Sequence, residues 1–157
     1  TSPILFHLID NFQCLRSAVL MTQKEVAKRI CASNGNKEYG ILSVLTQTYA
    51  HVQYLFDVKP GNFFPVPAVD SAVFKLNFFE QITQVDNEQF FRKIVRATFN
   101  TRRKMLRNSL GRNFDKSIVY SLNSVDINRR PEELSVNEFK SLANEINAKI
   151  KQAANEH

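Results

Sequence analysis

The residues best suited to chemistry on a ligand form one short run, Phe63-Phe64-Pro65-Val66-Pro67. Its two prolines fix φ and remove two backbone donors, so the run cannot join a sheet ladder and is held semi-rigid. Two interpretations follow. The Phe rings fill the core, as most Phe side chains do, or one ring stacks on a nucleobase taken out of an RNA, which stabilises the stacked base by ~1–3 kcal/mol.

A second group of residues favours a polyanionic partner. Residues 1–85 carry seven Lys and Arg against six Asp and Glu, whereas residues 86–157 carry fourteen against nine. Eight basic residues and no acidic one lie between positions 92 and 112: Arg92, Lys93, Arg96, Arg102, Arg103, Lys104, Arg107 and Arg112. A solvated helix face is the alternative, but such a face usually mixes both signs, and one-sided charge favours RNA phosphates.

The helical period assigns these basic residues to two predicted helices. The first lies just before residue 100, and the second starts at Asn100 or Thr101 and ends at Gly111. The residues predicted to bind RNA lie away from the apolar side of these helices: Arg92, Lys93, Arg96, Arg103, Lys104 and Arg107. Arg102 falls toward the apolar side, where it either pairs internally or reaches along the helix. The run from Arg129 to Glu133 mixes signs and is expected to be a structural ion-pair turn.

The sequence does not favour a metal site, a membrane-spanning segment or secretion. The two cysteines, Cys14 and Cys31, have no C-x-x-C spacing and the three histidines are scattered, so we expect no metal site and two reduced thiols, as in a cytoplasmic protein. No run approaches the ~18 apolar residues that span a bilayer, so we expect no membrane partner. We also expect no secretory signal at the start of the chain.

Around these residues, the sequence predicts an α/β part followed by helices. The predicted elements of the first part are a helix over 4–12, a strand over 17–21, a helix from a Thr22–Glu25 capping box to Cys31, a helix over 41–50, and alternating strands over 52–58 and 72–78. The 17–21 strand is apolar on both sides, which is typical of a central strand with a neighbour on each edge. The chain therefore begins as though cut from something larger.

The period becomes helical from Asp86 onward. Helix starts are predicted at caps Asp86, Asp115 and Ser135, the last with Glu138 in a capping box. We expect the division near residue 83, with 1–82 as an α/β part and 83–157 as a small all-α, RNA-binding domain.

The run Phe63-x-Pro65-x-Pro67-x-Val69-Asp70-Ser71 resembles the motif near the end of the methyltransferase domain in KsgA-type ribosomal RNA adenine dimethyltransferases. The resemblance extends, collinearly, over nearly the whole chain. It continues in Gln23-Lys-Glu-Val-Ala-Lys-Arg29, Tyr39-Gly-Ile-Leu-Ser-Val-Leu45, Arg102-Arg-Lys-Met-Leu-Arg-Asn108 and Arg130-Pro-Glu-Glu-Leu-Ser135.

This resemblance implies that residues 1–82 are the distal half of a Rossmann-like class I methyltransferase sheet. Phe63 would be the catalytic-site ring that stacks on the target adenine, and Phe64, at a variable position, would pack. The parent enzyme would use S-adenosylmethionine to methylate small-subunit ribosomal RNA. The family's Gly-rich donor loop and Asn-x-Pro-Tyr motif have no counterpart here, so the donor would be bound by the missing N-terminal half. The fragment alone is expected to be inactive and to self-associate.

Two rival interpretations stay open. One is a large-subunit adenine methylase of the antibiotic-resistance type, which shares the Phe-x-Pro-x-Pro motif. The other is a non-catalytic ribosome-assembly or nucleic-acid-binding module. The segments that begin at Arg102 and Arg130 favour the small-subunit type.

Overall fold

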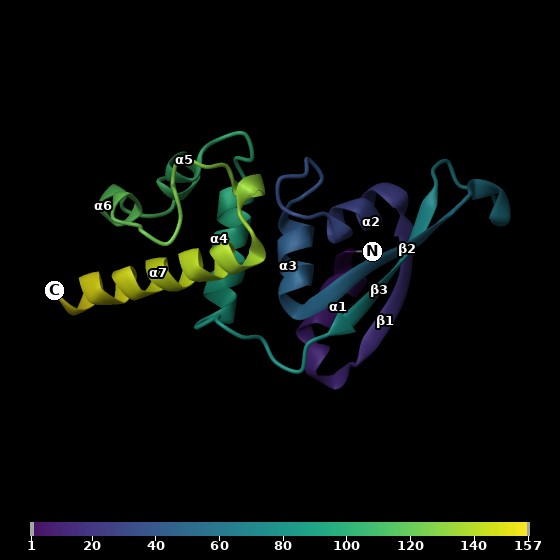
Figure 1. Cartoon of the computed structure of the whole chain (residues 1–157), viewed down its shortest axis with the longest axis horizontal. Helices are drawn as coiled ribbons and strands as arrows, with labels where there is room; N and C mark the ends of the chain where they lie inside the picture. The colour runs from purple at the N-terminus through teal and green to yellow at the C-terminus, as the bar shows by residue number, and fades with distance from the viewer. Residues whose placement is uncertain (1, 157) are drawn as a thin grey trace. The chain divides into compact units, whose positions relative to one another are not determined.

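The computed structural model describes residues 2–156. The chain divides into two compact units, one formed by residues 1–33 and 42–82 and the other by residues 34–41 and 83–157. Within residues 2–156 no helix is long and apolar enough to cross a membrane, and no group of three metal-ligating side chains gathers. Figure 1 shows the order of the elements along the chain.

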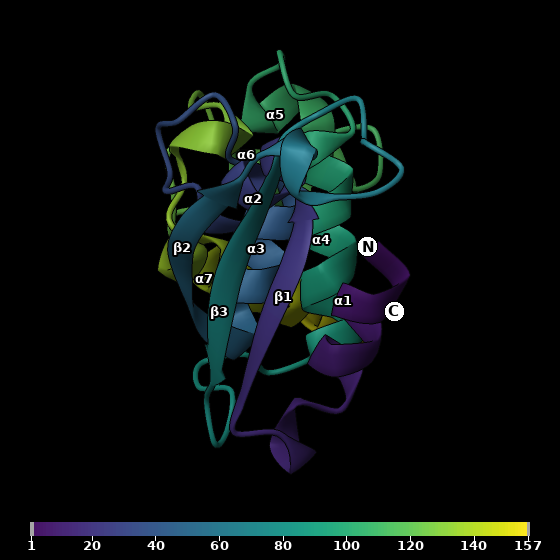
Figure 2. The same cartoon turned by 90° about the vertical axis from the view of Figure 1, so that its right-hand side faces the viewer.

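The first unit is a three-stranded sheet with helices on one face. Its elements are α1 (Ser2–Asp10), a 3-10 turn (Phe12–Cys14), β1 (Ser17–Gln23), α2 (Lys24–Cys31), α3 (Ile41–Tyr49), β2 (Ala50–Val58), a second 3-10 turn (Pro60–Asn62) and β3 (Ser71–Phe78). The strands lie in the order β1-β3-β2, and both pairings are antiparallel. Figure 2 looks onto the strands, with α2 and α3 behind them.

Buried and exposed side chains alternate along the strands, and the buried ones form the core of this unit. In β3 the side chains of Ala72, Phe74 and Leu76 are buried, while those between them are partly exposed. They pack with residues of the helices, among them Ile9 of α1 and Ile30 of α2. The period of two that predicted β2 and β3 is thus confirmed, with one register shift between Tyr54 and Phe56.

β1 differs from the strand that its composition predicts. Val19 is 59% exposed and Met21 is 51% exposed, because they lie on the face of the sheet opposite to the core. In the described chain β1 pairs with β3 alone and is an edge strand. The prediction of a capping box at Thr22 is wrong: Thr22 and Gln23 still pair with Ala72 and Ser71 in the ladder, so α2 begins at Lys24.

The second unit is helical. It contains α4 (Glu88–Phe99), α5 (Leu106–Leu110), α6 (Lys116–Tyr120), a 3-10 turn (Pro131–Glu133) and α7 (Val136–Asn155). The predicted caps Asp115 and Ser135 are confirmed, and Ser135 forms a full capping box with Glu138. The cap of α4 is Asn87 rather than Asp86, because the Asn87 side chain accepts the Phe90 N–H at 2.9 Å.

Residues 34–41 pack with the helical unit, whereas the predicted division places them with the sheet. The Gly35 N–H donates to the Glu132 carbonyl at 2.7 Å. Arg102 donates to the carbonyls of Lys37 and Tyr39, the second at 2.8 Å. The Tyr39 ring also packs edge-on against Phe99, with centroids 6.2 Å apart. These contacts attach the 34–41 loop firmly to α4 and its C-terminal turn.

Candidate functional site

The Phe63 run lies in the segment that joins β2 to β3, residues 59–70. The backbone of Phe63 is extended, with φ −121° and ψ 152°, and its N–H donates to the Pro60 carbonyl at 3.1 Å. Neighbouring side chains of an extended segment point to opposite sides. In agreement with this, Phe63 is partly buried and Phe64 is 99% exposed. The expectation that Phe64 packs in the core is therefore wrong.

Charged side chains tie the two ends of this segment together. Lys59 Nζ lies 2.9 Å from Asp70 Oδ2, and Lys24 Nζ lies 2.5 Å from Asp57 Oδ2 and 3.8 Å from Asp70 Oδ2. The Tyr54 hydroxyl donates to Asp57 Oδ1. We call Lys24, Tyr54, Asp57, Lys59 and Asp70 the loop clasp. The backbone adds to it, because the Lys24 N–H donates to the Asp70 carbonyl at 2.9 Å.

The clasp changes the proton affinity of its members. The hydrogen bond from Lys24, followed by that from Tyr54, holds the pKa of the Asp57 carboxyl below its ordinary value of 3.8. The same contact with Asp57 raises the pKa of Lys24 above 10.5. Desolvation, with the hydrogen bond to Asp57 second, raises the pKa of Tyr54 to about 12. Lys24 and Asp57 are therefore charged at neutral pH.

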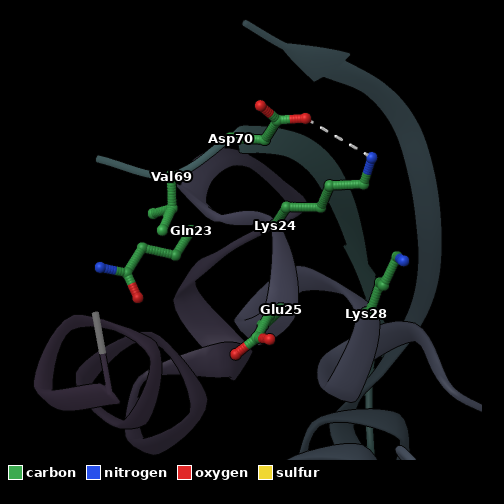
Figure 3. A pocket seen from close by; sticks show the side chains of 6 residues that line it. All are labelled: Gln23, Lys24, Glu25, Lys28, Val69 and Asp70. Carbon is green, nitrogen blue, oxygen red and sulfur yellow. Dashed lines mark ion pairs between the residues drawn. The ribbon is translucent and has the colours of Figure 1, made fainter. Parts of the chain in front are cut away.

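A cavity of about 270 Å³ adjoins the clasp at the carboxyl end of β1. Its lining residues are Gln23, Lys24, Glu25, Lys28, Val69 and Asp70. Figure 3 shows the Lys24 side chain extending toward Asp70, with Gln23 and Val69 on another wall. A second hollow, at the opposite end of β1, includes Cys14 and Phe79 but no residue of the 59–70 segment. Of the two hollows, only the cavity beside the clasp includes residues of the 59–70 segment, Val69 and Asp70, so it is the candidate ligand-binding region.

The sequence did not predict the clasp as a group. Asp70 belongs to the motif that begins at Phe63 and Lys24 to the predicted helix start, but their partner Asp57 lies on β2. One available signal was that Lys59 and Asp70, of opposite charge, flank the proline-rich run at its two ends. Only the strand pairing brings Lys24, Asp57 and Asp70 to one place.

The six predicted RNA-binding residues all lie in the helical unit, but the single helix predicted for residues 100–111 does not form. Residues 101–104 are a turn, and α5 begins at Leu106. Because the N–H groups of Leu106 and Arg107 donate to the carbonyls of Arg129 and Ile127, the start of α5 is fixed by the 127–129 segment. The predicted helical arc of Arg103, Lys104 and Arg107 is therefore wrong.

Their surroundings differ from one residue to the next. Arg92, on α4, pairs with Glu88 at 3.3 Å, and Lys93 Nζ lies 5.9 Å from the centroid of the Phe114 ring. Arg96 is exposed in the last turn of α4. Arg103 and Lys104 are exposed in the turn, and no acidic side chain within residues 2–156 pairs with either.

Arg107 is half-buried on α5. Of the six, Lys93, Arg96, Arg103 and Lys104 are exposed, and Arg92 and Arg107 are half-buried.

Two basic residues outside this set have structural roles. Arg102 donates hydrogen bonds to the carbonyls of Lys37 and Tyr39. Of the two predicted alternatives for this residue, internal pairing is therefore confirmed. Arg129 pairs with Glu138 at 2.5 Å and donates to the Glu133 carbonyl at 2.7 Å. The predicted structural role of the 129–133 run is confirmed, although its acidic partner is on α7.

The described residues do not fit a methyl-donor site of the kind that a Gly-rich loop makes. Gly35 and Gly40 belong to the loop between α2 and α3, Gly61 to the 3-10 turn after β2, and Gly111 to the end of α5. None of them stands between a strand and the start of a helix, where such a loop holds a nucleotide-like ligand.

Comparisons with known proteins identify the family. A family model described as ribosomal RNA adenine dimethylase matches residues 1–148. Proteins named ribosomal RNA small subunit methyltransferase A are 44% identical over 151 residues in Phocaeicola vulgatus and 47% identical over 146 residues in Chlorobium phaeobacteroides. These alignments cover 96% and 93% of this chain and 54% of each relative, so the chain spans about half the length of the curated relatives it matches.

Solved structures are similar as well. A dimethyladenosine transferase from Plasmodium falciparum has a TM-score of 0.83 and 28% identity, over 95% of this chain and 63% of that one. The 23S rRNA methyltransferase ErmE has a TM-score of 0.59 and 18% identity, over 84% of this chain and 55% of that one, and shows the fold alone. The α/β sheet with its following helices is thus the distal part of a methyltransferase fold, and the chain belongs to the ribosomal RNA adenine dimethylase family.

Proposed function

We propose that the protein containing this chain transfers methyl groups from S-adenosylmethionine to the N6 amine of adenines in small-subunit ribosomal RNA, in the cytoplasm. The chain itself supplies the ring that stacks on the target base and a basic surface for the RNA. The observation that carries the proposal is the Phe63 loop, clasped at both ends beside a charged cavity. Membership of the adenine dimethylase family supports it.

Methyl transfer to an adenine amine requires that the base be held in a fixed orientation. An adenine amine is a poor nucleophile because its lone pair is delocalised into the ring, so transfer needs alignment with the donor and acceptors around the amine. A partly buried ring on a fixed loop can orient the base at little entropic cost. The Asp70 carboxylate pairs with Lys59 at 2.9 Å, which suits it to holding the loop.

The methyl donor would be bound outside this chain. When bound, S-adenosylmethionine supplies the methyl group. The described residues do not fit it, and the relatives are about twice as long as the aligned region. We therefore assign the donor site, and the acceptors that align the amine, to the other half of the protein. Residues 1–82 would then complete that catalytic domain, and residues 83–157 would bind RNA.

RNA binding would use the exposed part of the basic set. Arg103 and Lys104 stand in a turn directly after α4, and Arg96 lies in the last turn of that helix. Arginine and lysine side chains of this kind contact phosphates without reading sequence. Lys93, held over the Phe114 ring, and Arg92, paired with Glu88, would contribute less.

The two rivals make different predictions. A large-subunit methylase would modify 23S-type RNA, and a non-catalytic module would bind RNA without modifying it. The names of the relatives favour the small-subunit target, because the proteins at 44% and 47% identity are small-subunit methyltransferases.

The test is a methyl-transfer assay on the full-length protein encoded by the source gene. With labelled S-adenosylmethionine, we expect label in N6,N6-dimethyladenine of immature small subunits and none in large-subunit RNA. The opposite labelling would establish the large-subunit rival, and binding without labelling would establish the module. The 157-residue chain alone should give no saturable heat with the donor in calorimetry. Micromolar binding there would show that the donor site is within this chain.

A further inference from the structure

Phe64 has a degree of exposure that sets it apart from the other apolar side chains. It is 99% exposed, whereas the next most exposed large apolar residue, Val66 on the same loop, is 64% exposed. Single exposed apolar residues are common on protein surfaces, so exposure alone assigns no role. The loop and its surroundings supply the further evidence.

The loop restricts the backbone that carries the Phe64 ring before any partner binds. Pro60, Pro65 and Pro67 each fix φ, and the pair between Lys59 and Asp70 closes the base of the loop at 2.9 Å. A side chain on such a platform loses less conformational freedom on binding than one on a flexible loop. An exposed ring on a restricted backbone is therefore suited to contact a partner.

The side chains near the loop indicate a partner that is both aromatic and charged. Beyond Val69 the wall of the adjoining cavity is polar, with Gln23, Glu25 and Lys28. An apolar protein surface would leave these groups without partners, whereas RNA offers base faces to a ring and phosphates to a lysine. The extended backbone at Phe63 turns the two Phe rings to opposite sides of the loop. They cannot both cover one base.

We propose that Phe64 stacks on a second, unpaired nucleobase of the RNA, next to the base that Phe63 holds. The inference rests on the proposed function, because it needs an RNA in which the target base lies in a single-stranded region. It extends that function because each of the two Phe rings of the loop would stack on a different base. Phe64 is then a binding residue that selects unpaired RNA around the target.

The absence of tryptophan from the sequence provides a direct test. Phe64→Trp introduces one indole at this position, and Val66→Trp introduces one at an exposed position of the same loop as the matched control. Each variant of the full chain is titrated with a single-stranded, adenine-containing RNA oligonucleotide and with a blunt duplex of the same strand, while anisotropy of labelled RNA reports binding. We expect saturable quenching of Phe64→Trp by the single strand, little quenching by the duplex, and a smaller effect in Val66→Trp.

Two substitutions separate a stacked base from an apolar protein contact. Phe64→Ala and Phe64→Leu should both lower affinity for the single strand by about 5- to 150-fold, because stacking needs a ring face. Restoration of affinity by Phe64→Leu, or RNA binding with no change in Phe64→Trp emission, would overturn this inference and leave the proposed function standing. A chain that binds no RNA in any form would overturn both.

Discussion

Phe63 is the residue whose role the loop geometry makes easiest to test. Its ring is partly buried, its backbone is extended, and the loop that carries it is tied at both ends by ion pairs. If the Phe63 ring mainly packs in the core, its removal lowers the stability of the protein. If the ring mainly stacks on the target base, its removal lowers the turnover of the enzyme.

We expect Phe63→Ala in the full-length enzyme to lose most of the stacking free energy, ~1–3 kcal/mol, mainly as methylation rate and with a small change in melting temperature. Phe63→Tyr and Phe63→Trp should keep much of the activity, because each has a ring face. Turnover and melting temperature are measured for each variant. If Phe63→Ala melts far earlier and keeps its turnover per folded molecule, Phe63 is a core residue.

The neighbours Arg102 and Arg103 form a matched pair for separating structure from RNA binding. Arg102→Ala removes the hydrogen bonds to two carbonyls of the 34–41 loop, so we expect a loss of about 1–3 kcal/mol of unfolding free energy, with RNA affinity per folded molecule kept. Arg103→Ala should leave the melting temperature unchanged. It should weaken RNA binding and reduce the slope of log affinity against log salt by roughly 0.7–0.9, the value of one phosphate contact.

Denaturant unfolding and RNA titrations at several salt concentrations check both variants. The reverse pattern, with stability lost in Arg103→Ala and salt dependence lost in Arg102→Ala, would contradict the assignment.

At the scale of elements, the clasp connects the carboxyl end of β1 to the loop between β2 and β3. Because its residues titrate, the clasp stabilises the loop only within a defined pH range. The folded pKa of Asp57 is lowered, so its contribution is present above about pH 3.8 and is lost as the pH falls through the folded value. The folded pKa of Lys24 is raised, so its contribution is present below about pH 10.5 and is lost as the pH rises through the folded value.

We therefore expect the 59–70 loop to be held through the neutral range and to loosen at acid pH, below 3.8. Amide signals of Asn62 and Phe63, followed by NMR during an acid titration, should shift in that range before the core unfolds. Asp57→Asn removes the titrating group and serves as the control. An acid transition of equal size in Asp57→Asn would show that other carboxyls hold the loop.

For the whole molecule, the main feature is the unpaired edge of the sheet at β1. In the described chain β1 pairs only with β3. Met21, Val73 and Phe56 lie next to one another across the three strands on the face away from the core, with Met21 51% and Phe56 57% exposed. Leu5 of α1, by contrast, is buried. An unpaired edge beside exposed apolar side chains favours association.

We expect the isolated chain to associate with itself as its concentration rises, while residues 86–156 stay folded. Met21→Lys should shift sedimentation profiles toward the monomer, because a lysine on this face opposes pairing. Val66→Lys makes the same change at a position on the loop and should leave association unaltered. A sharp monomer boundary for the unaltered chain, with uniformly slow amide exchange along β1, would contradict the prediction.

The sequence by itself determined the elements whose signals are local: the alternating β2 and β3, the caps Asp115 and Ser135, and the stiff Phe63 run. It could not determine where long-range contacts overrule local propensity. The ladder keeps Thr22 in β1, the 127–129 carbonyls set the start of α5, and Arg102 joins the 34–41 loop to the helical unit. The exposure of Phe64 and the meeting of Lys24 with Asp57 were likewise decided by tertiary structure. Strand pairing joins residues that lie far apart in the chain, and their spacing carries no record of it.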